Sequence, residues 1–328
     1  MATPTTTFGS ASPVTGSRSF LARLREGDEI ARLVTFLFAA TVVLITILLV
    51  YELWVNSVLP RHKFGFHFFV TSVWDPIMDE YGALPFIYGT LVTSAVALII
   101  AVPLGIGAAI FLAELAPPRT SDTLQFFIDL LAAVPSVIYG LLGVFIIVPL
   151  MRTVIAPTLI KTLGFLPIFK GPSYGVGFFT AGIVMAIMVI PYIISVSREV
   201  LLSVPRDQRE AALALGSTRW ESTWQVVVPF AKTGIMGSIF LAMARALGET
   251  MAVTMVIGNS PKIAASLFAP GYSIAAVIAN EFTEATGDMY LQSLVYLGLV
   301  LFLLTFLLNG MARLLILATT QKGSKVAA

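Results

Sequence analysis

Long apolar runs alternate with short polar segments along most of the chain. Six of these runs exceed the roughly 20 residues that a helix needs to cross a hydrocarbon core of about 30 Å. The pattern therefore predicts an all-α, polytopic membrane protein with six transmembrane helices. The runs fall near residues 33–53, 88–115, 124–150, 177–200, 231–257 and 289–317.

Proline lies inside three of the predicted helices, at Pro103, Pro135 and Pro191. A proline removes one backbone hydrogen bond and loosens or kinks a helix. Freed carbonyls persist in a membrane only where protein or a water-filled cavity satisfies them. We therefore expect the central helices to line an internal space.

The hydropathy pattern also divides the chain into regions. Residues 1–30 begin with a Thr/Ser/Pro/Gly-rich stretch, which is typical of a disordered cytoplasmic tail. Residues 31–87 hold the first transmembrane helix, which is too long for a signal peptide, and an extracytoplasmic segment. Residues 88–317 form the core domain, and residues 318–328 a cytoplasmic tail. Residues 151–172 are predicted to be re-entrant or surface-lying, and residues 260–288 to include a short helix.

The distribution of basic residues sets the predicted orientation, because cytoplasmic loops are enriched in Lys and Arg. With the N-terminus inside, thirteen of the 20 Lys and Arg residues lie in segments 1–32, 116–123, 198–232 and 313–328. Six lie in the outer segments, and Arg245 is left within a helix. Both termini are therefore expected in the cytoplasm.

Composition excludes several classes of protein. Hydrophobic residues make up 57% of the chain and charged residues 12%, about half the charged share of a soluble domain. There is no cysteine, and neither His62 nor His67 has a third metal-ligating partner nearby, so no metal site is expected. A net charge of +2 does not suggest nucleic-acid binding.

A polar stretch, RDQREAALALGSTRWESTWQVVVP, interrupts the apolar pattern at Arg206–Pro229. Its first half is rich in helix formers, and Gly216 suits the left-handed residue after a helix. Thr218 and Glu221 have the spacing of a capping box that starts a second helix. We call this predicted helix–turn–helix the elbow, and we expect Pro229 to close it. The elbow should present Ala211, Ala212, Leu215, Trp220 and Trp224.

The elbow resembles the EAA loop of ABC-importer permeases, with E-A-A at Glu210–Ala212 followed by Gly216 and Pro229. The alternative is an ordinary amphipathic interfacial helix. The resemblance implies the type I ABC-importer permease fold, with residues 203–230 as a cytoplasmic coupling loop that docks on an ATPase subunit. It assigns this coupling role to Glu210, Ala211, Ala212, Gly216, Trp220 and Trp224.

A charged pair, Arg245 and Glu249, lies in the fifth predicted helix within the sequence ARALGETMAV. Counted from Ala231, Arg245 lies about 21 Å along that helix, near the bilayer centre. An uncompensated Arg there costs at least ~2.5–3.5 kcal/mol. Four residues on, Glu249 is expected on the same face, where it would hold Arg245 in place. A guanidinium suits an oxyanion, although a purely structural ion pair is the alternative.

The sequence around this pair, R-A-x-G-E-T followed by Met251–Val253, is similar to permeases of phosphate-specific ABC importers, PstC type rather than PstA type. PSVIYG at Pro135–Gly140 and GTLVTS at Gly89–Ser94 also fit this family, over residues 88–317. The resemblance implies that Arg245 and Glu249 belong to the phosphate pathway.

The resemblance also implies a set of partners in a prokaryotic cell membrane. These are a homologous PstA-like permease, two cytoplasmic PstB-like ATPase subunits and an extracytoplasmic PstS-like phosphate-binding protein. The chain has no G-x-x-x-x-G-K-[ST] motif, so ATP and Mg²⁺ are expected on the ATPase partner and no cofactor on this chain. It is therefore expected to be a transport subunit and not an enzyme.

Two other functions remain open from the sequence. One is the permease of another oxyanion importer, for molybdate or sulfate. The other is an ion-coupled secondary transporter in which Glu249 carries protons. The remaining acids, Glu114, Asp129 and Glu199, are expected to form interfacial pairs near helix ends.

Overall fold

The computed structural model describes residues 28–324, so residues 1–27 of the predicted N-terminal tail and residues 325–328 of the predicted C-terminal tail lie outside the described residues. Six helices in it are long and apolar enough to cross a membrane. The one sheet among the described residues is a hairpin of two-residue strands, β1 (Trp74–Asp75) and β2 (Glu80–Tyr81). The predicted all-α, six-helix membrane protein is therefore confirmed.

Besides that hairpin, the described chain consists of α-helices, four π-helical segments and one 3₁₀ turn. In order these are α2 (Asp28–Val55), α3 (Val58–Phe64), α4 (His67–Val70), α5 (Leu84–Ile110), η1 (Phe111–Leu115), α6 (Pro118–Ala132), α7 (Ser136–Leu142), η2 (Gly143–Ile147), α8 (Val148–Leu150), η3 (Met151–Ile155), α9 (Ala156–Leu163), η4 (Pro167–Phe169), α10 (Phe178–Leu202), α11 (Arg206–Ala214), α12 (Arg219–Ser222), η5 (Thr223–Val227), α13 (Val228–Leu247), α14 (Met251–Val256), α15 (Ile274–Glu281) and α16 (Asp288–Ser324).

Most of the first long helix, α2, belongs to a compact unit that ends at Glu52, and the chain from Leu53 onward forms a second unit. Within α2, bulky apolar side chains such as Phe36 and Phe38 are exposed. That exposure suits a helix surrounded by lipid. The helix covers the first predicted span.

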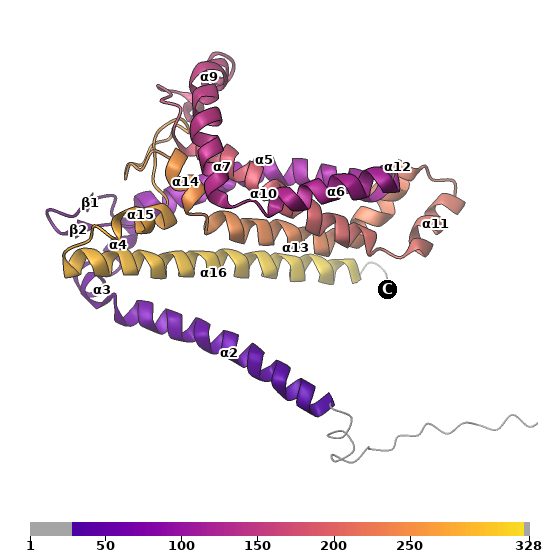
Figure 1. Ribbon diagram of the computed structural model, residues 1–328, viewed down its shortest axis with the longest axis horizontal. Helices are drawn as coiled ribbons and strands as arrows, with labels where there is room; N and C mark the ends of the chain where they lie inside the picture. Colours follow the sequence, from indigo (N-terminus) through magenta and orange to yellow (C-terminus); the bar gives the residue numbers. More distant parts are fainter. Residues whose placement is uncertain (1–27, 325–328) are drawn as a thin grey trace, which may run out of the picture. The chain divides into compact units, whose positions relative to one another are not determined.

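Helix α10 is the centre of the second unit, and it packs against α5, α6, α13 and α14 (Figure 1). Small residues bring α5 and α10 together, because a Cβ atom on Gly182 would lie 2.4 Å from the Val96 side chain. Such close backbone approach is typical of helix pairs in membranes, where no hydrophobic effect drives association. The closely packed α5–α10 pair is therefore the core around which the other helices of the second unit lie.

Each π-helical segment ends two residues before a proline. The prolines are Pro117 after η1, Pro149 after η2, Pro157 after η3 and Pro229 after η5. Within an α-helix a proline ring clashes with the carbonyl four residues earlier and leaves it unpaired. The wider π turn moves that carbonyl away, so the chain passes three of these prolines, those after η2, η3 and η5, without leaving the helix.

The third span differs from the prediction of residues 124–150. Helix α6 ends at Ala132, and Pro135 separates it from a second helical stretch, Ser136–Leu163. Residues 151–163, within the segment predicted to be re-entrant or surface-lying, continue this stretch through η3 and α9, so the expected break at their proline is wrong. The π turns η2 and η3 accommodate the prolines that follow them, so the helix does not break there.

Aromatic side chains fill the end of the second unit around the hairpin. Trp74 and Tyr81 pack edge to face, and Tyr81 stacks on Tyr290. Glu281, at the end of α15, accepts hydrogen bonds from Trp74 and Tyr290, each 2.8 Å long. Helix α15 confirms the short helix that was predicted within residues 260–288.

Candidate substrate pathway and coupling elbow

The elbow forms as the sequence predicts. Helix α11 ends at Ala214, and Gly216 follows with φ +91°, the left-handed conformation that suits glycine. The Thr218 hydroxyl accepts from the Glu221 backbone N–H, and the Glu221 carboxylate accepts from the Thr218 N–H. This capping box starts α12 directly after the turn.

The exposed surface of the elbow is largely the predicted one. Leu215 is 89% exposed, and Trp220 and Trp224 are exposed with their rings 5.6 Å apart. Glu210 and Ala211 are exposed as well. Ala212 departs from the prediction, because it is buried and its carbonyl accepts from the Ser217 N–H. The remaining side chains offer an apolar, aromatic surface to a partner.

Pro229 does not close the elbow. The helix that begins at Arg219 continues through η5 and α13 to Leu247 as one candidate span. The π turn of η5 removes the clash that a proline would otherwise create. The second half of the elbow is therefore the beginning of a candidate membrane-spanning helix.

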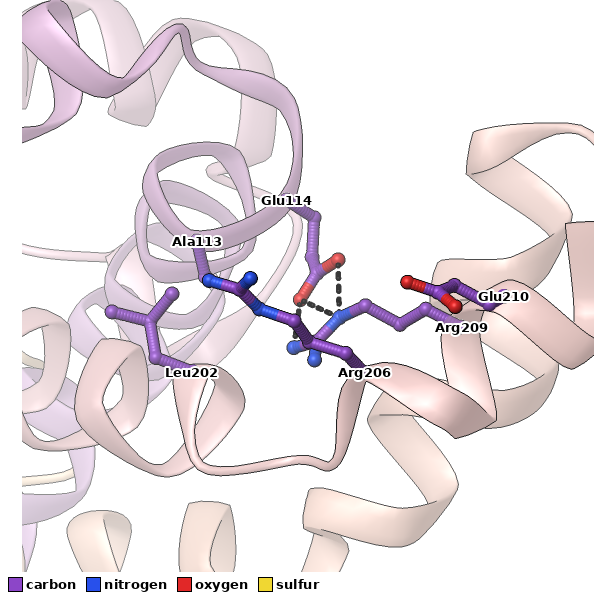
Figure 2. A pocket seen from close by; sticks show the side chains of 6 residues that line it. All are labelled: Ala113, Glu114, Leu202, Arg206, Arg209 and Glu210. Carbon is purple, nitrogen blue, oxygen red and sulfur yellow. Dashed lines mark hydrogen bonds and ion pairs between the residues drawn. The ribbon is translucent and has the colours of Figure 1, made fainter.

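An ion pair that the sequence did not reveal joins the elbow to α5 through η1. The Nη2 atom of Arg209 lies 2.8 Å from Glu114 Oε1, and the same guanidinium donates to the carbonyls of Leu201 and Val204. Figure 2 shows Arg209 reaching from α11 to Glu114 in a pocket of about 360 Å³, which is lined by Ala113, Glu114, Leu202, Arg206, Arg209 and Glu210.

The fifth predicted helix is interrupted between Arg245 and Glu249. Helix α13 ends at Leu247, Gly248 has φ −94° and ψ 0°, and α14 begins at Met251. Glycine has a low helix propensity, which favours a break at this point. The expectation that Arg245 and Glu249 share one helix face is therefore wrong.

Arg245 lies over an aromatic ring. Its Cζ atom is 4.2 Å from the centroid of Tyr192, a cation–π contact. Its Nε atom is buried without a hydrogen bond. No carboxylate oxygen among the described residues lies within 4.0 Å of the guanidinium nitrogens, the limit for an ion pair. Tyr192 is close to the middle of α10, so Arg245 does lie at mid-span depth. A mid-span guanidinium thus retains donors for an anion.

Glu249 binds the backbone at the start of α14 and does not pair with Arg245. Its Oε1 atom accepts a hydrogen bond of 3.1 Å from the Ala252 N–H, in the first turn of α14. A helix N-terminus favours an anion, and a helix C-terminus favours a cation. Glu249 lies at the N-terminus of α14, and Arg245 lies in the last turn of α13. Each charge is therefore stabilised by a helix end, and Glu249 does not hold Arg245 as predicted.

A second helix break, at residues 133–135, lies beside the first. The Tyr192 hydroxyl donates to the Ala132 carbonyl at the end of α6, and Tyr139 of α7 donates to Leu131. Helices α7 and α14, which follow the two breaks, pack closely at Gly140. Broken helices at membrane depth occur where a cavity or protein satisfies the backbone. Sequence analysis missed both Tyr139 and Tyr192, although the motif PSVIYG contains Tyr139.

The other acids pair near helix ends, as expected for Glu114 and Glu199. Glu114 binds Arg209, and Glu199 lies 3.5 Å from Arg198. Asp129 differs, because its partners are the neutral side chains of Ser195 and Gln125. Among residues 28–324 no group of three or more His, Asp or Glu side chains could hold a metal ion.

Comparisons with known proteins identify the family. Residues 101–320 match the family described as the inner membrane component of binding-protein-dependent transport systems. A phosphate transport system permease protein PstC from Mesorhizobium japonicum is 48% identical, covering 77% of this chain and 79% of the relative. Its counterpart from Haemophilus influenzae is 45% identical, covering 91% of this chain and 96% of the relative.

A solved bacterial ABC transporter that imports alginate has the same fold, with a TM-score of 0.56 and 16% identity over 89% of this chain and 98% of that chain. The methionine transporter MetNI in an inward-facing state has a TM-score of 0.52 and 15% identity, covering 75% of this chain and 99% of that chain. The chain belongs to the inner membrane components of binding-protein-dependent transport systems, and among them to the PstC-type permeases.

Proposed function

We propose that this chain is the transmembrane permease subunit of an ATP-driven importer of inorganic phosphate. The observation that carries the proposal is the Arg245 guanidinium, which is held at mid-span between two helix breaks with a buried, unpartnered Nε atom. A planar fork of N–H donors suits a tetrahedral oxyanion. The names of the relatives, phosphate transport system permeases, support phosphate as that anion.

The proposal includes the partners of an importer in the cell membrane. Phosphate arrives from an extracytoplasmic PstS-like binding protein and crosses between this chain and a PstA-like permease, past Arg245 and Glu249. Two cytoplasmic PstB-like subunits bind ATP and Mg²⁺ and dock on the elbow through Glu210, Ala211, Gly216, Trp220 and Trp224. Both termini are cytoplasmic in this arrangement.

The coupling role of the elbow is supported by its continuity with a span. The exposed side chains Leu215, Trp220 and Trp224 offer an apolar surface of the kind that anchors protein interfaces. The helix behind them extends to Arg245 in the last turn of α13. Movement of a docked ATPase would therefore reach the substrate pathway through one helix.

The test is phosphate uptake by the complete complex in proteoliposomes, with ATP inside and the binding protein outside. We expect uptake of radioactive phosphate that requires ATP and stimulates ATP hydrolysis. Arg245→Gln should abolish uptake, whereas Arg119→Gln, a matched change at an exposed arginine outside the elbow, should not. Uptake driven by an ion gradient without ATP, or transport of molybdate or sulfate in place of phosphate, would overturn the proposal.

A further inference from the structure

A polar cluster lies one helical turn from Tyr192, between α6 and α10. The Oδ1 atom of Asp129 accepts hydrogen bonds of 2.7 Å from Ser195 Oγ and from Gln125 Nε2. Gln125 Nε2 also lies 2.9 Å from Ser195 Oγ, while its Oε1 atom is buried without a partner. The cluster thus combines a carboxylate, a hydroxyl and an unused amide acceptor.

The cluster follows Arg245 and Tyr192 in a series of polar groups that leads toward the elbow. Tyr192 lies under the guanidinium and donates to Ala132. Ser195 is one turn beyond Tyr192 on α10, and Asp129 is one turn before Ala132 on α6, both toward the elbow. An anion that leaves Arg245 in that direction meets this cluster next.

Asp129 lies beside Ser195, a residue within the candidate membrane span Phe178–Leu202. It is about 16 Å along α6 from Pro118, among the exposed apolar side chains of Phe126, Phe127 and Leu130. Its own side chain is exposed, and no described cation lies within 4.0 Å of its carboxylate. Ionisable groups at such depth face a bundle interior or a water-filled path and mark ion pathways.

A carboxylate on an anion pathway discriminates between oxyanions. Ionised Asp only accepts hydrogen bonds, so it repels an anion that has no proton to donate. Every phosphate species present at neutral pH carries a P–OH group, which donates to a carboxylate, whereas sulfate and molybdate carry none. Ser195 Oγ can rotate to donate to an oxygen of the same anion.

We infer that Asp129, together with Ser195 and Gln125, is a selectivity site for protonated oxyanions on the elbow side of Arg245. The P–OH group of phosphate donates to the Asp129 carboxylate, and a phosphate oxygen accepts from the Ser195 hydroxyl. Gln125 orients the carboxylate through its amide. This inference rests on the proposed function, because it assumes that phosphate passes Arg245 toward the cytoplasm.

The test uses sulfate in the lumen of proteoliposomes that import phosphate, where the lumen corresponds to the cytoplasm. Lumenal sulfate reaches the cluster without passing the binding protein. We expect the wild-type complex to resist lumenal sulfate relative to chloride of equal ionic strength. Asp129→Asn should be inhibited at about tenfold lower sulfate concentration, because the amide can donate a hydrogen bond to sulfate.

Three further variants keep the test decisive. Asp122→Asn neutralises a largely exposed carboxylate on the same helix, whose partner is Arg198, and should keep the resistance of the wild type. Asp129→Glu should keep it too, because a carboxylate remains. Asp129→Ser removes the charge with a smaller side chain and should be sensitive to lumenal sulfate. This variant provides the test if Asp129→Asn does not assemble.

The possible results separate this inference from the proposed function. Sulfate resistance in Asp129→Asn and Asp129→Ser complexes that still import phosphate would overturn the selectivity site and leave the phosphate importer intact. Equal sensitivity of Asp122→Asn would overturn it too, since any charge on α6 would then suffice. A wild-type complex that imports no phosphate would overturn the proposed function, and this inference with it.

Discussion

Arg209 and Glu114 join the elbow to the end of α5 through a bidentate pair. Both carboxylate oxygens of Glu114 accept from Arg209, with Nη2 at 2.8 Å and Nε at 3.3 Å (Figure 2). The two side chains are only 20% and 10% exposed. Since α5 packs along α10 and α13, this pair connects the predicted docking surface with the helices that surround Arg245.

The first prediction is that Glu114→Gln weakens the coupling of ATP hydrolysis to uptake. Breaking a buried pair by neutralising one partner costs ~3–5 kcal/mol, because the remaining charge stays buried. We expect the variant to hydrolyse more ATP per phosphate imported, measured as both rates in the same proteoliposomes. Arg119→Gln, at an exposed arginine outside the elbow and outside this pocket, is the control and should leave the ratio unchanged. An unchanged ratio in assembled Glu114→Gln would contradict the coupling role.

The second prediction separates backbone conformation from side-chain space at the turn of the elbow. A Cβ atom added at Gly216 would meet no other atom within 4 Å. The backbone φ of Gly216 is +91°, a left-handed conformation that residues with a side chain disfavour. Gly216→Ala should therefore cost ~1–2 kcal/mol and weaken ATPase docking, and Gly216→Val should uncouple hydrolysis from transport. Gly237→Ala, at an open helical position, is the matched control. Docking is measured as the ATPase retained through purification.

The elbow could be predicted closely because each of its signals is local. A left-handed glycine and an S/T-x-x-E capping box depend on a few neighbouring residues and not on tertiary packing. The Arg209–Glu114 pair could not be predicted, because its partners are far apart in the sequence and meet only when α5 and α10 pack together. Sequence analysis therefore located the elbow but not its attachment.

The third and fifth spans were misplaced for a different reason. Proline was treated as a terminator at Pro229 and within residues 151–163, yet π turns carry the helix past it at both places. By contrast, Pro135 and Gly248 do mark breaks. A helix continues past a proline where a wider π turn fits in the surrounding structure. The hydropathy pattern contains no information about that space. The opposite error, a missed break at Gly248, placed Arg245 and Glu249 on one helix.

The third prediction concerns orientation in the membrane. Reagents that do not cross the membrane should label a cysteine at Lys262 from outside and one at Arg219 from inside only. The sequence contains no native cysteine, so the background is clean, and both positions are exposed. A cysteine at Lys63, near the hairpin, should also be labelled from outside. Reversed labelling would overturn the orientation that the basic residues predict.

The last prediction tests how Arg245 and Glu249 divide their roles. Arg245→Gln should abolish phosphate uptake, and Arg245→Lys should reduce it by about 10–100-fold, because Lys keeps the charge but loses the planar fork over Tyr192. Glu249→Gln should reduce uptake less, since its amide oxygen can still accept from the Ala252 N–H. Tyr192→Phe keeps the ring beneath the guanidinium and is the control for the lost hydroxyl.

The exchange of the two charges gives the sharpest contrast. In Arg245→Glu/Glu249→Arg, the anion moves to the end of α13 and the cation to the start of α14, so each charge lies at the unfavourable helix end. A salt bridge between the two residues would survive such an exchange, but this arrangement should not. We expect the double variant to import no phosphate even where co-purification verifies assembly. Substantial uptake by the assembled double variant would show that the pair acts as an exchangeable ion pair and that Arg245 does not contact the substrate.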